Sequence, residues 1–365
     1  MIDINLLRTN PELVKWSQRK RGEDDSIVDK VLEYDKLWRE TIRKINDLRK
    51  ERNKKSAEVA KLKKEGKLED LERIRKEMKE LNSKIEELEK KEKEYKELRD
   101  RLLMSIPNIV HETVPDGLSE EDNVPIRFWG HFKVWEGYLD VFKEQLKGHN
   151  VDYEIISWKP KSHVDLLEEL DIGDTKRAAK VAGSRFYYLK NELALLDLAI
   201  AIFAIEELVK KGYTPVIPPY MLRREAMEGV TDLSAFEEML YKIEDEDLYL
   251  IATAEHSIGA MFMDEILEEK DLPLKFVGFS PCFRKEAGAH GRDTKGIFRV
   301  HQFHKVEQFI FSHPEDSWSL HEEITRNAED LLQKLGIPYR VVNICAGELG
   351  AVAAKKYDIE AWMPA

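Results

Sequence analysis

The fold is decided by residues 274–310, LKFVGFSPCFRKEAGAHGRDTKGIFRVHQFHKVEQFI. An apolar-rich run from Leu274 to Phe283 passes through a loop with three glycines and continues as an alternating run from Phe298 to Ile310. Two such runs joined by a glycine-containing loop predict a long antiparallel β-hairpin. We therefore expect a fold of the α+β class, with this hairpin at the centre of an antiparallel sheet flanked by helices.

One face of the second arm has an unusual composition. Because side chains alternate along a strand, cations, aromatic rings and a carboxylate recur there at every second residue. These residues are Arg299, His301, Phe303, Lys305, Glu307 and Phe309. On the first arm, Cys282, Arg284 and Glu286 share a face, and the planar guanidinium of Arg284 suits phosphate oxygens. A solvated face with surface ion pairs explains the same pattern, so the residues alone leave both interpretations open.

The string FRKEAGAHGRDTKGIFRVHQFHKVEQF, residues 283–309, closely resembles motif 2 of class II aminoacyl-tRNA synthetases, in the form carried by seryl-tRNA synthetases. The resemblance implies a serine–tRNA ligase, which activates L-serine with ATP and transfers the seryl group to the 3′ end of tRNA(Ser). We expect tRNA(Sec) to be serylated as well. Such chemistry relies on positioning and fixed positive charge, so no covalent nucleophile is expected.

The resemblance also implies roles for residues of the hairpin. Arg284 would be catalytic, holding the α-phosphate and stabilising its developing charge. Glu286 would accept a hydrogen bond from the adenine amino group, and Phe303 would stack on the adenine ring. Lys285 and Val300 are the remaining expected ATP contacts. Alternation turns the Val300 side chain away from the face of Phe303, so we assign Val300 a backbone role.

The segment Thr253-Ala254-Glu255 stands where a predicted strand, residues 248–251, gives way to a helix. One interpretation is a helix N-cap, with Thr253 capping and Glu255 complementing the helix dipole. The resemblance implies a second role, because seryl-tRNA synthetases carry a TxE loop here that contacts serine. Together with Glu307, these three residues form the expected L-serine site, which would discriminate against substrates without a hydroxyl group.

Residues 193–209 are rich in Ala, Leu and Ile and are followed by Lys210-Lys211-Gly212, which predicts a buried helix with a glycine stop. The following GYTPVIPPYML, residues 212–222, resembles motif 1 of class II synthetases, with Pro219 as its characteristic proline. The resemblance implies that this helix and strand form a homodimer interface. We also expect a strand at residues 183–189 and a helix at residues 318–335.

Two heptad series, from Val31 to Leu62 and from Leu71 to Leu102, are separated by a short polar break around Gly66. They predict an antiparallel coiled-coil hairpin of about residues 28–104. Between Arg43 and Lys64 there are ten Lys/Arg and three acidic residues. A solvated charged face is one interpretation, but the resemblance implies an arm that holds the variable arm of tRNA(Ser) by charge and shape.

The chain has 365 residues, which favours two domains. We expect an N-terminal domain at residues 1–107, a linker at 108–130 and a class II catalytic domain at 131–365. Residues 40–101 hold 22 Lys/Arg and 17 Asp/Glu, a net charge of +5, whereas the whole chain carries −12. An acidic body with a basic appendage is compatible with an RNA partner. Abundant Glu and Lys fit a heat-adapted source.

Two cysteines, Cys282 and Cys345, are too few for a disulfide framework or a four-cysteine zinc site. His290, His301 and His304 suggest a metal site, but positions 301 and 304 fall on opposite strand faces, so we expect no metal-binding residues here. Mg²⁺ is expected to accompany ATP. The sequence has no signal-like start and no apolar run long enough for a membrane span, so we expect a reduced, cytoplasmic protein.

The family's motif 3 has no counterpart in these 365 residues, which suggests a truncated form. Two alternatives to an active ligase therefore stay open. One is a non-catalytic tRNA-binding synthetase paralogue, and the other is a ligase that loads an amino acid onto a carrier protein. The intact two-helix arm argues against the carrier protein, which needs no RNA clamp.

Overall fold

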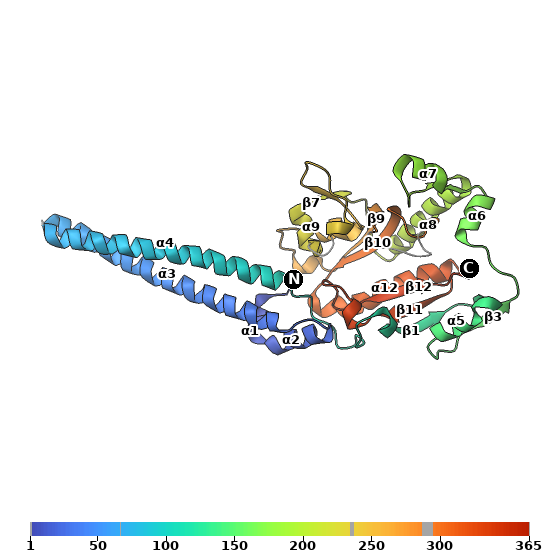
Figure 1. The fold of residues 1–365 in the computed structure, drawn as a ribbon, viewed down its shortest axis with the longest axis horizontal. Coiled ribbons are helices and arrows are strands. Elements are labelled where there is room, and N and C mark those ends of the chain that lie inside the picture. Colours follow the sequence, from blue (N-terminus) through green and yellow to red (C-terminus); the bar gives the residue numbers. More distant parts are fainter. Residues whose placement is uncertain (1, 66, 234–236, 287–294, 365) are drawn as a thin grey trace. The chain divides into compact units, whose positions relative to one another are not determined.

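The structure is a computed structural model that describes residues 2–65, 67–233, 237–286 and 295–364 (Figure 1). The chain forms two compact units. The first comprises residues 1–124 and 343–356, and the second comprises residues 125–342 and 357–365. The α+β class is confirmed, whereas the domain boundaries at residues 107 and 130 stay a prediction.

The first unit is built around a pair of long helices, α3 (Ser26–Glu65) and α4 (Leu68–Met104), which lie side by side (Figure 1). This confirms the predicted coiled-coil hairpin, and Gly66 of its predicted turn lies outside the described residues. The 40 residues of α3 extend about 60 Å at ~1.5 Å per residue. The other elements of this unit are short: α1 (Ile4–Thr9), α2 (Pro11–Lys20), η1 (Glu120–Asp122) and η7 (Ala346–Glu348).

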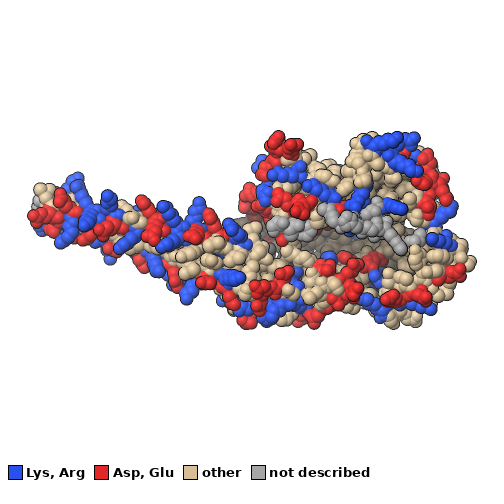
Figure 2. Space-filling model, in the orientation of Figure 1, with Lys and Arg blue, Asp and Glu red and all other residues tan. Residues whose placement is uncertain are grey.

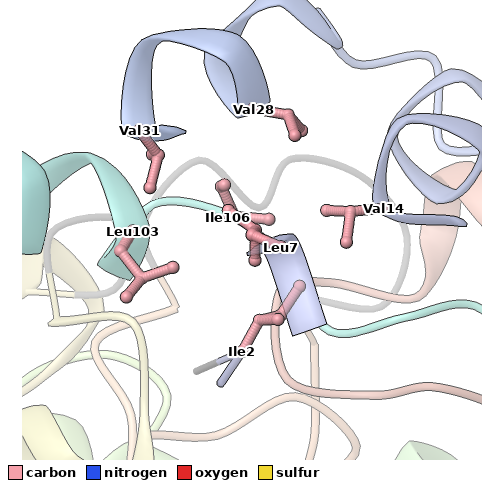
Figure 3. Packing of buried hydrophobic residues seen from close by; sticks show 7 residues of the cluster. All are labelled: Ile2, Leu7, Val14, Val28, Val31, Leu103 and Ile106. Carbon is pink, nitrogen blue, oxygen red and sulfur yellow. The ribbon is translucent and has the colours of Figure 1, made fainter. Parts of the chain in front are cut away.

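An apolar core joins the hairpin to the short helices at its base (Figure 3). The buried side chains come from α1 and the chain just before it, from α2, from the start of α3, and from the end of α4 and the chain that follows it: Ile2, Leu7, Val14, Val28, Val31, Leu103 and Ile106. Burying a side chain of this size contributes about 1.5–3 kcal/mol relative to leaving it exposed. This core fixes the hairpin at its base, since α3 and α4 otherwise contact mainly each other.

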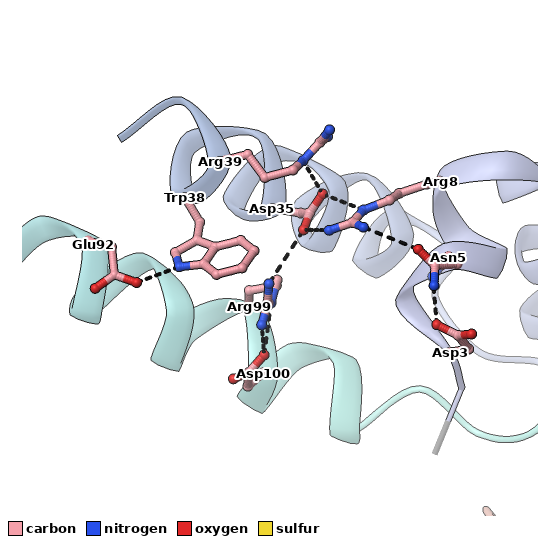
Figure 4. Close-up of polar contacts among 9 residues, drawn as sticks. All are labelled: Asp3, Asn5, Arg8, Asp35, Trp38, Arg39, Glu92, Arg99 and Asp100. Atoms are coloured by element: carbon pink, nitrogen blue, oxygen red, sulfur yellow. Dashed lines mark hydrogen bonds and ion pairs between the residues drawn. The ribbon is translucent and has the colours of Figure 1, made fainter. Parts of the chain in front are cut away.

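A buried carboxylate reinforces that base (Figure 4). Asp35 of α3 has no exposed side-chain surface, and it accepts hydrogen bonds from Arg8 of α1 at 2.6 and 2.9 Å. Arg39 Nε lies 2.9 Å from Asp35, and Arg99 Nη1 of α4 lies 3.5 Å from it. The Arg99 guanidinium also covers the ring of Trp38, 4.3 Å from its centre. One carboxylate thus links α1, α3 and α4.

Polar pairs cross the hairpin further out. They are Trp38 with Glu92 at 2.7 Å, Arg49 with Glu89 at 2.7 Å and Lys55 with Glu77 at 2.5 Å. A small apolar cluster of Leu62, Leu71 and Ile74 closes the far end. Figure 2 shows Lys and Arg along the visible face of the hairpin, interspersed with Asp and Glu. Its surface therefore carries both signs of charge, with the cationic surplus concentrated in the sequence of α3 between Arg43 and Lys64.

A late segment of the chain belongs to the first unit. The buried guanidinium of Arg21 donates hydrogen bonds to the carbonyl groups of Asn108, Gly350 and Ala353 at 2.6–2.8 Å. The backbone N–H of Asn108 donates to the carbonyl of Ala351 at 2.8 Å. Residues 343–356 are therefore tied to the chain just after α2 and just after α4.

The second unit contains the predicted hairpin as β9 (Leu274–Phe283) and β10 (Gln302–Phe311), with β6 (Thr214–Val216) parallel to β9 on its other edge. A further three-stranded sheet has the order β1 (Val124–Trp129), β11 (Tyr339–Asn343), β12 (Tyr357–Ala361). The short strands pair two by two: β2 (Phe132–Trp135) with β3 (Tyr153–Ile156), β4 (Gly173–Asp174) with β5 (Tyr188–Leu189), and β7 (Met221–Arg223) with β8 (Leu248–Leu250).

The helical elements of the second unit follow in chain order: η2 (Glu136–Tyr138), α5 (Leu139–Gln145), α6 (His163–Glu169), α7 (Thr175–Ala182), α8 (Asn191–Lys210), α9 (Arg224–Val230), η3 (Glu237–Met239), α11 (Ala254–Gly259), η4 (Glu269–Asp271), η6 (Pro314–Asp316) and α12 (Ser317–Lys334). The helix α12 confirms the prediction at residues 318–335. Of the described helices, none is both long and apolar enough to span a membrane.

Helices cover the two faces of the hairpin differently. On one face, Val277, Val306 and Ile310 pack against α8 in a cluster with Leu208 and Tyr213. On the other face, the short helix α11 contacts both β9 and β10. Alternation along the strands then assigns Phe303, Lys305 and Glu307 to the α11 face.

Two strand predictions need correction. The second arm of the hairpin starts at Gln302 rather than at Phe298, which is 60% exposed. Residues 298–301 continue the alternating pattern in sequence, but only the Arg284 N–H to His301 carbonyl bond, at 3.0 Å, extends the ladder. The strand expected at residues 183–189 is reduced to β5, because Arg185 adopts a positive φ of 62° that no extended strand allows.

The helix α8 was expected to be buried, and this prediction is wrong for the single chain. Its apolar residues surround the helix, but the chain fully buries only Ala201, Ala204 and Leu208 among them. Leu193, Phe203 and Ile205 are half-buried. Six further apolar side chains are between 42% and 69% exposed: Leu195, Leu196, Leu198, Ile200, Ile202 and Val209. An apolar surface of this kind is typical of an association interface.

Candidate active site

The hairpin register brings the predicted residues of β10 onto one face. Phe303, Lys305 and Glu307 lie opposite Cys282, Ser280 and Gly278, respectively. Phe303 and Glu307 are four residues apart, which corresponds to about 13 Å at ~3.3 Å per residue. The predicted adenine-stacking ring and the predicted serine-binding carboxylate are thus separated by roughly the length of an aminoacyl-nucleotide.

The helix α11 begins directly above Glu307. Thr253 is its N-cap, with a side chain that accepts a hydrogen bond from the Glu255 N–H. The close approach requires a glycine at position 278, because a Cβ there would lie 2.7 Å from Ile258 Cδ1 and 3.0 Å from Ala254 Cβ. The capping interpretation of the Thr253-Ala254-Glu255 segment is therefore confirmed, and the same cap places these residues beside the predicted serine-binding carboxylate.

Glu307 is the centre of a hydrogen-bond network. Its Oε2 accepts from the Thr253 hydroxyl and, at 3.0 Å, from the backbone N–H of Glu255. Its Oε1 accepts from Lys305 Nζ at 2.9 Å, and the same ammonium donates to Thr253 Oγ1 at 2.9 Å. The Glu307 side chain is 13% exposed. These donors fix the orientation of a nearly buried carboxylate.

The Glu255 carboxylate has no hydrogen bond or ion pair within the described part of the chain. Its surface remains open to solvent, yet protein surrounds it closely enough that desolvation, followed by the charge of Glu307, raises its pKa. Lys305 and Arg284 oppose this rise. A carboxylate that is anchored only through its backbone and still lacks a partner can accept a cationic ligand.

The predicted ATP residues Arg284 and Phe303 lie together. The Arg284 guanidinium carbon is 5.2 Å from the centre of the Phe303 ring, and Nε donates to the carbonyl of Ala252 at 3.3 Å. Ala252 directly precedes the cap residue Thr253. An arginine that can hold phosphate and a ring that can stack on a base therefore stand next to the start of α11.

The other predicted ATP residues lie around Arg284. Glu286 is 13% exposed, has a positive φ of 49° and pairs with Arg299 at 3.1 Å. The Lys285 ammonium lies 5.7 Å from the centre of the Tyr241 ring, so its side chain is directed towards that ring. Val300 is 5% exposed, so a ligand could reach it mainly through its backbone.

The histidines of this region have partners of other kinds. His301 Nδ1 pairs with the Arg284 carbonyl at 2.9 Å, and His304 Nδ1 pairs with Asp197 of α8 at 2.6 Å. His290 lies outside the described residues. Across residues 2–65, 67–233, 237–286 and 295–364, no group of three or more His, Cys, Asp or Glu could hold a metal ion. Cys282 is buried, and burial raises the pKa of its thiol.

Sequence reasoning missed three residues of this site. Lys305 was placed on the correct face but was given no role, although its position between Phe303 and Glu307 pointed to one. Gly278 gave no signal, because its importance depends on the height of α11 above the sheet. His256 is buried beside the network, where desolvation lowers its pKa to about 4, and its Nδ1 has no partner among the described residues.

Comparison with known families defines the class of protein. A family model described as the tRNA synthetase class II core domain (G, H, P, S and T) matches residues 240–365. A second family model, the seryl-tRNA synthetase N-terminal domain, matches residues 1–110. These two matches define the protein as a class II aminoacyl-tRNA synthetase.

Individual relatives narrow this class. The chain is 61% identical to the serine–tRNA ligase of Pyrococcus abyssi, over all of this chain and 80% of that protein. The crystal structure of seryl-tRNA synthetase from Pyrococcus horikoshii complexed with ATP has a TM-score of 0.89 and 58% identity, covering all of this chain and 81% of that one. The crystal structure of the cytoplasmic serine–tRNA ligase from Naegleria fowleri in complex with AMP has a TM-score of 0.85 and 37% identity, covering all of this chain and 82% of that one. The chain belongs to the seryl-tRNA synthetase family.

Proposed function

We propose that this chain activates L-serine with ATP and transfers the seryl group to the 3′ end of tRNA(Ser). The observation that carries the proposal is the shared face of β10, where a phosphate-binding arginine and an aromatic ring adjoin a pair of carboxylates at the start of α11. The relatives crystallised with ATP and with AMP support a nucleotide at this site.

Each proposed role combines what the resemblance implies with the position of a side chain. Arg284 binds the α-phosphate of ATP and stabilises the charge that develops when the serine carboxylate attacks the α-phosphorus. Phe303 stacks on adenine, Glu286 accepts from the adenine amino group, and Lys285 and Val300 are the outer contacts of the nucleotide. The products of this step are seryl-adenylate and pyrophosphate.

The serine end of the site lies at α11. We assign the substrate ammonium to the unpartnered Glu255 carboxylate and the substrate hydroxyl to Glu307, with Thr253 and Ala254 forming the wall between them. Positioning supplies most of the catalytic effect, because the reacting carboxylate and phosphate are held in one orientation. A substrate without the hydroxyl would lose its hydrogen bond to Glu307, which favours serine over alanine.

Mg²⁺ is expected with ATP, but the described residues do not form a cluster that fits a divalent ion. We therefore propose that the ion arrives bound to the nucleotide. In this chain the positive charge next to the phosphates comes from Arg284, which is always protonated.

The hairpin of α3 and α4 is the proposed tRNA-binding element. The cationic surplus of α3 is exposed at Arg43, Lys54, Lys61 and Lys63, where phosphate groups can reach it. Contacts between cationic side chains and phosphate groups recognise the charge and shape of an RNA rather than its base sequence. We accordingly extend the proposal to tRNA(Sec), which would use the same arm.

The exposed apolar face of α8 supports a homodimer through the motif 1 region. Ile217, just after β6, is 75% exposed and extends the same apolar character beyond the helix. The compartment that we propose is the cytoplasm. Light scattering of the purified protein tests the dimer, and an Ile202→Glu variant is expected to shift it towards monomer.

The deciding experiment is serine-dependent exchange between ATP and pyrophosphate, followed by serylation of tRNA(Ser), with the full-length protein. We expect exchange with serine and background levels with alanine. Binding of tRNA without any exchange would refute the ligase and favour a non-catalytic tRNA-binding paralogue. Replacing Lys54, Lys61 and Lys63 together by Glu should weaken tRNA charging, most strongly at low salt because the wild type loses its extra phosphate contacts as salt is added, and should leave exchange unchanged.

A further inference from the structure

Lys305 occupies the middle of the amino-acid site. Its ammonium donates to Thr253 Oγ1 and to Glu307 Oε1, both at 2.9 Å, so it joins the cap of α11 to the strand β10. Its side chain is 32% exposed, so it is neither a core lysine nor a free surface one. The position between Phe303 and Glu307 puts its charge between the proposed nucleotide end and the proposed serine end.

The charges around Lys305 show why the site needs it. The backbone N–H of Glu255, at the start of α11, donates to Glu307 Oε2 on β10 at 3.0 Å, and desolvation followed by the charge of Glu307 raises the pKa of Glu255. The neighbouring groups from the remaining elements are Arg284 just after β9, His256 on α11 and Cys282 on β9. Arg284 bonds to the Ala252 carbonyl, whereas Lys305 bonds directly to Glu307 and its charge opposes the rise in the pKa of Glu255.

Two like charges in one site favour protonation of one of them unless a cation is supplied. A protonated Glu255 could not bind the ammonium of an amino acid by charge. We propose that Lys305 is a positioning residue of the amino-acid site, which orients Glu307 and supplies a positive charge that favours the ionised form of Glu255. This inference rests on the proposed function and assigns no bond from Lys305 to the substrate.

The test uses the full-length protein and the pH profile of serine-dependent pyrophosphate exchange. Lys305→Gln and Lys305→Met remove the charge, and Lys305→Arg keeps it. Lys275→Gln is the matched control, because Lys275 lies on β9 of the same sheet, is 21% exposed and bonds Glu323 at 2.7 and 2.9 Å, away from the site. Thermal melting of every variant precedes the kinetics.

We expect the acidic limb of the kcat/KM profile for serine to move up by about one to three pH units in the neutral variants, which is the effect of one nearby opposite charge. At neutral pH this lowers kcat/KM for serine by up to about 10-fold, and activity recovers as the pH is raised. Lys305→Arg should restore the position of the limb. The KM for ATP should change less than about twofold, because uniform nucleotide binding is not altered.

Parallel profiles for wild type and the Lys305 variants, with activity lowered equally at every pH, would show a merely structural role and overturn the inference. An equal shift of the limb in Lys275→Gln would do the same. The proposed function fails separately, through absence of serine-dependent exchange in the wild type, and the inference would then fall with it.

Discussion

Two groups of buried or enclosed carboxylates in this molecule have opposite charge balances. At the base of the hairpin, Asp35 is surrounded by Arg8, Arg39 and Arg99 (Figure 4). In the second unit, Lys305 bonds to Glu307, whereas the Glu255 carboxylate has no bonded partner among the described residues. Burial alone would raise the pKa of Asp35, but the Arg8 hydrogen bond and the three guanidinium charges hold it below its ordinary value. The pKa of Glu255 is raised.

The difference separates a structural cluster from a binding site. In the Asp35 cluster, Arg8, Arg39 and Arg99 bond to Asp35, and Arg99 also bonds to Asp100, so the cluster joins three helices. The Glu255 carboxylate has no such partner among the described residues, and the proposed substrate ammonium would supply one. A carboxylate without a countercharge at an ordered site is typical of a binding site for a cation.

The largest expected effect is on the second group. Glu307→Gln should lower serine-dependent exchange about 100- to 1,000-fold, because it removes a charged acceptor from the substrate site. Glu323→Gln is the control, since Glu323 also bonds a lysine of this sheet but lies away from the site. Near-normal exchange in Glu307→Gln would mean that Glu307 belongs with the structural carboxylates.

Asp35→Asn should act on stability instead. Loss of the carboxylate leaves three arginines without their common partner and should cost about 3 kcal/mol in the free energy of unfolding. Because the pKa of Asp35 is lowered in the folded state, its contribution is present above its ordinary value and is lost as the pH falls through the lowered value. Denaturant titrations at neutral and acidic pH should therefore show the gap to wild type closing in acid.

Exchange activity of the folded Asp35→Asn protein should stay within about twofold of wild type, since the change only alters the first unit. The exposed Asp47, which pairs only with Lys50 at 3.3 Å among the described residues, provides the control variant Asp47→Asn. A stability loss as large in Asp47→Asn would contradict the structural role of the Asp35 cluster.

Gly278→Ala tests the support of the carboxylate pair. The added methyl group would press on Ala254 and Ile258 and should cost about 1–3 kcal/mol of stability. Serine exchange should fall further than stability predicts, because the cap of α11 moves away from Glu307. Gly229→Ala is the control, since its Cβ would meet nothing within 4 Å among the described residues. Equal exchange activity in the two variants would contradict a role of the α11 packing in positioning the site.

The smallest expected effect on stability has the opposite sign and concerns Glu255. Because the pKa of Glu255 is raised in the folded protein, wild-type stability falls as the pH rises from its ordinary value through the raised value. Glu255→Gln removes this cost and should be slightly more stable than wild type at neutral pH, by less than about 1 kcal/mol because the group is open to solvent. Serine exchange should be lost. A variant that is less stable at neutral pH would contradict the charge shortage.

Much of this arrangement could be predicted from local patterns. The heptads defined α3 and α4, and the alternation around Phe303 gave the correct face for Lys305 and Glu307. The start of β10 was misplaced because alternation alone does not show where strand pairing ends. The burial of α8 was misjudged because hydrophobicity does not distinguish a core from an interface.

The charge balance of the two groups could not be predicted. Asp35 lies outside the two heptad series. Arg39 is its i,i+4 neighbour on α3, but Arg8 and Arg99 come from two other helices, so no local pattern brings all three arginines together. Gly278 is needed because of the packing of α11, which is a tertiary contact. Lys305 was visible on its face, but only the hydrogen bonds to Thr253 and Glu307 show what it does.

The bonds of Arg21 have a consequence for the order of folding. Its guanidinium is satisfied by carbonyl groups at positions 108, 350 and 353, so the N-terminal unit includes backbone that is synthesised more than 200 residues later. During translation the hairpin can form early, because its contacts are local. Two of the three acceptors of Arg21, the carbonyl groups of Gly350 and Ala353, appear only when residue 353 emerges from the ribosome. Completion of the first unit is therefore coupled to synthesis of the chain as far as residue 356.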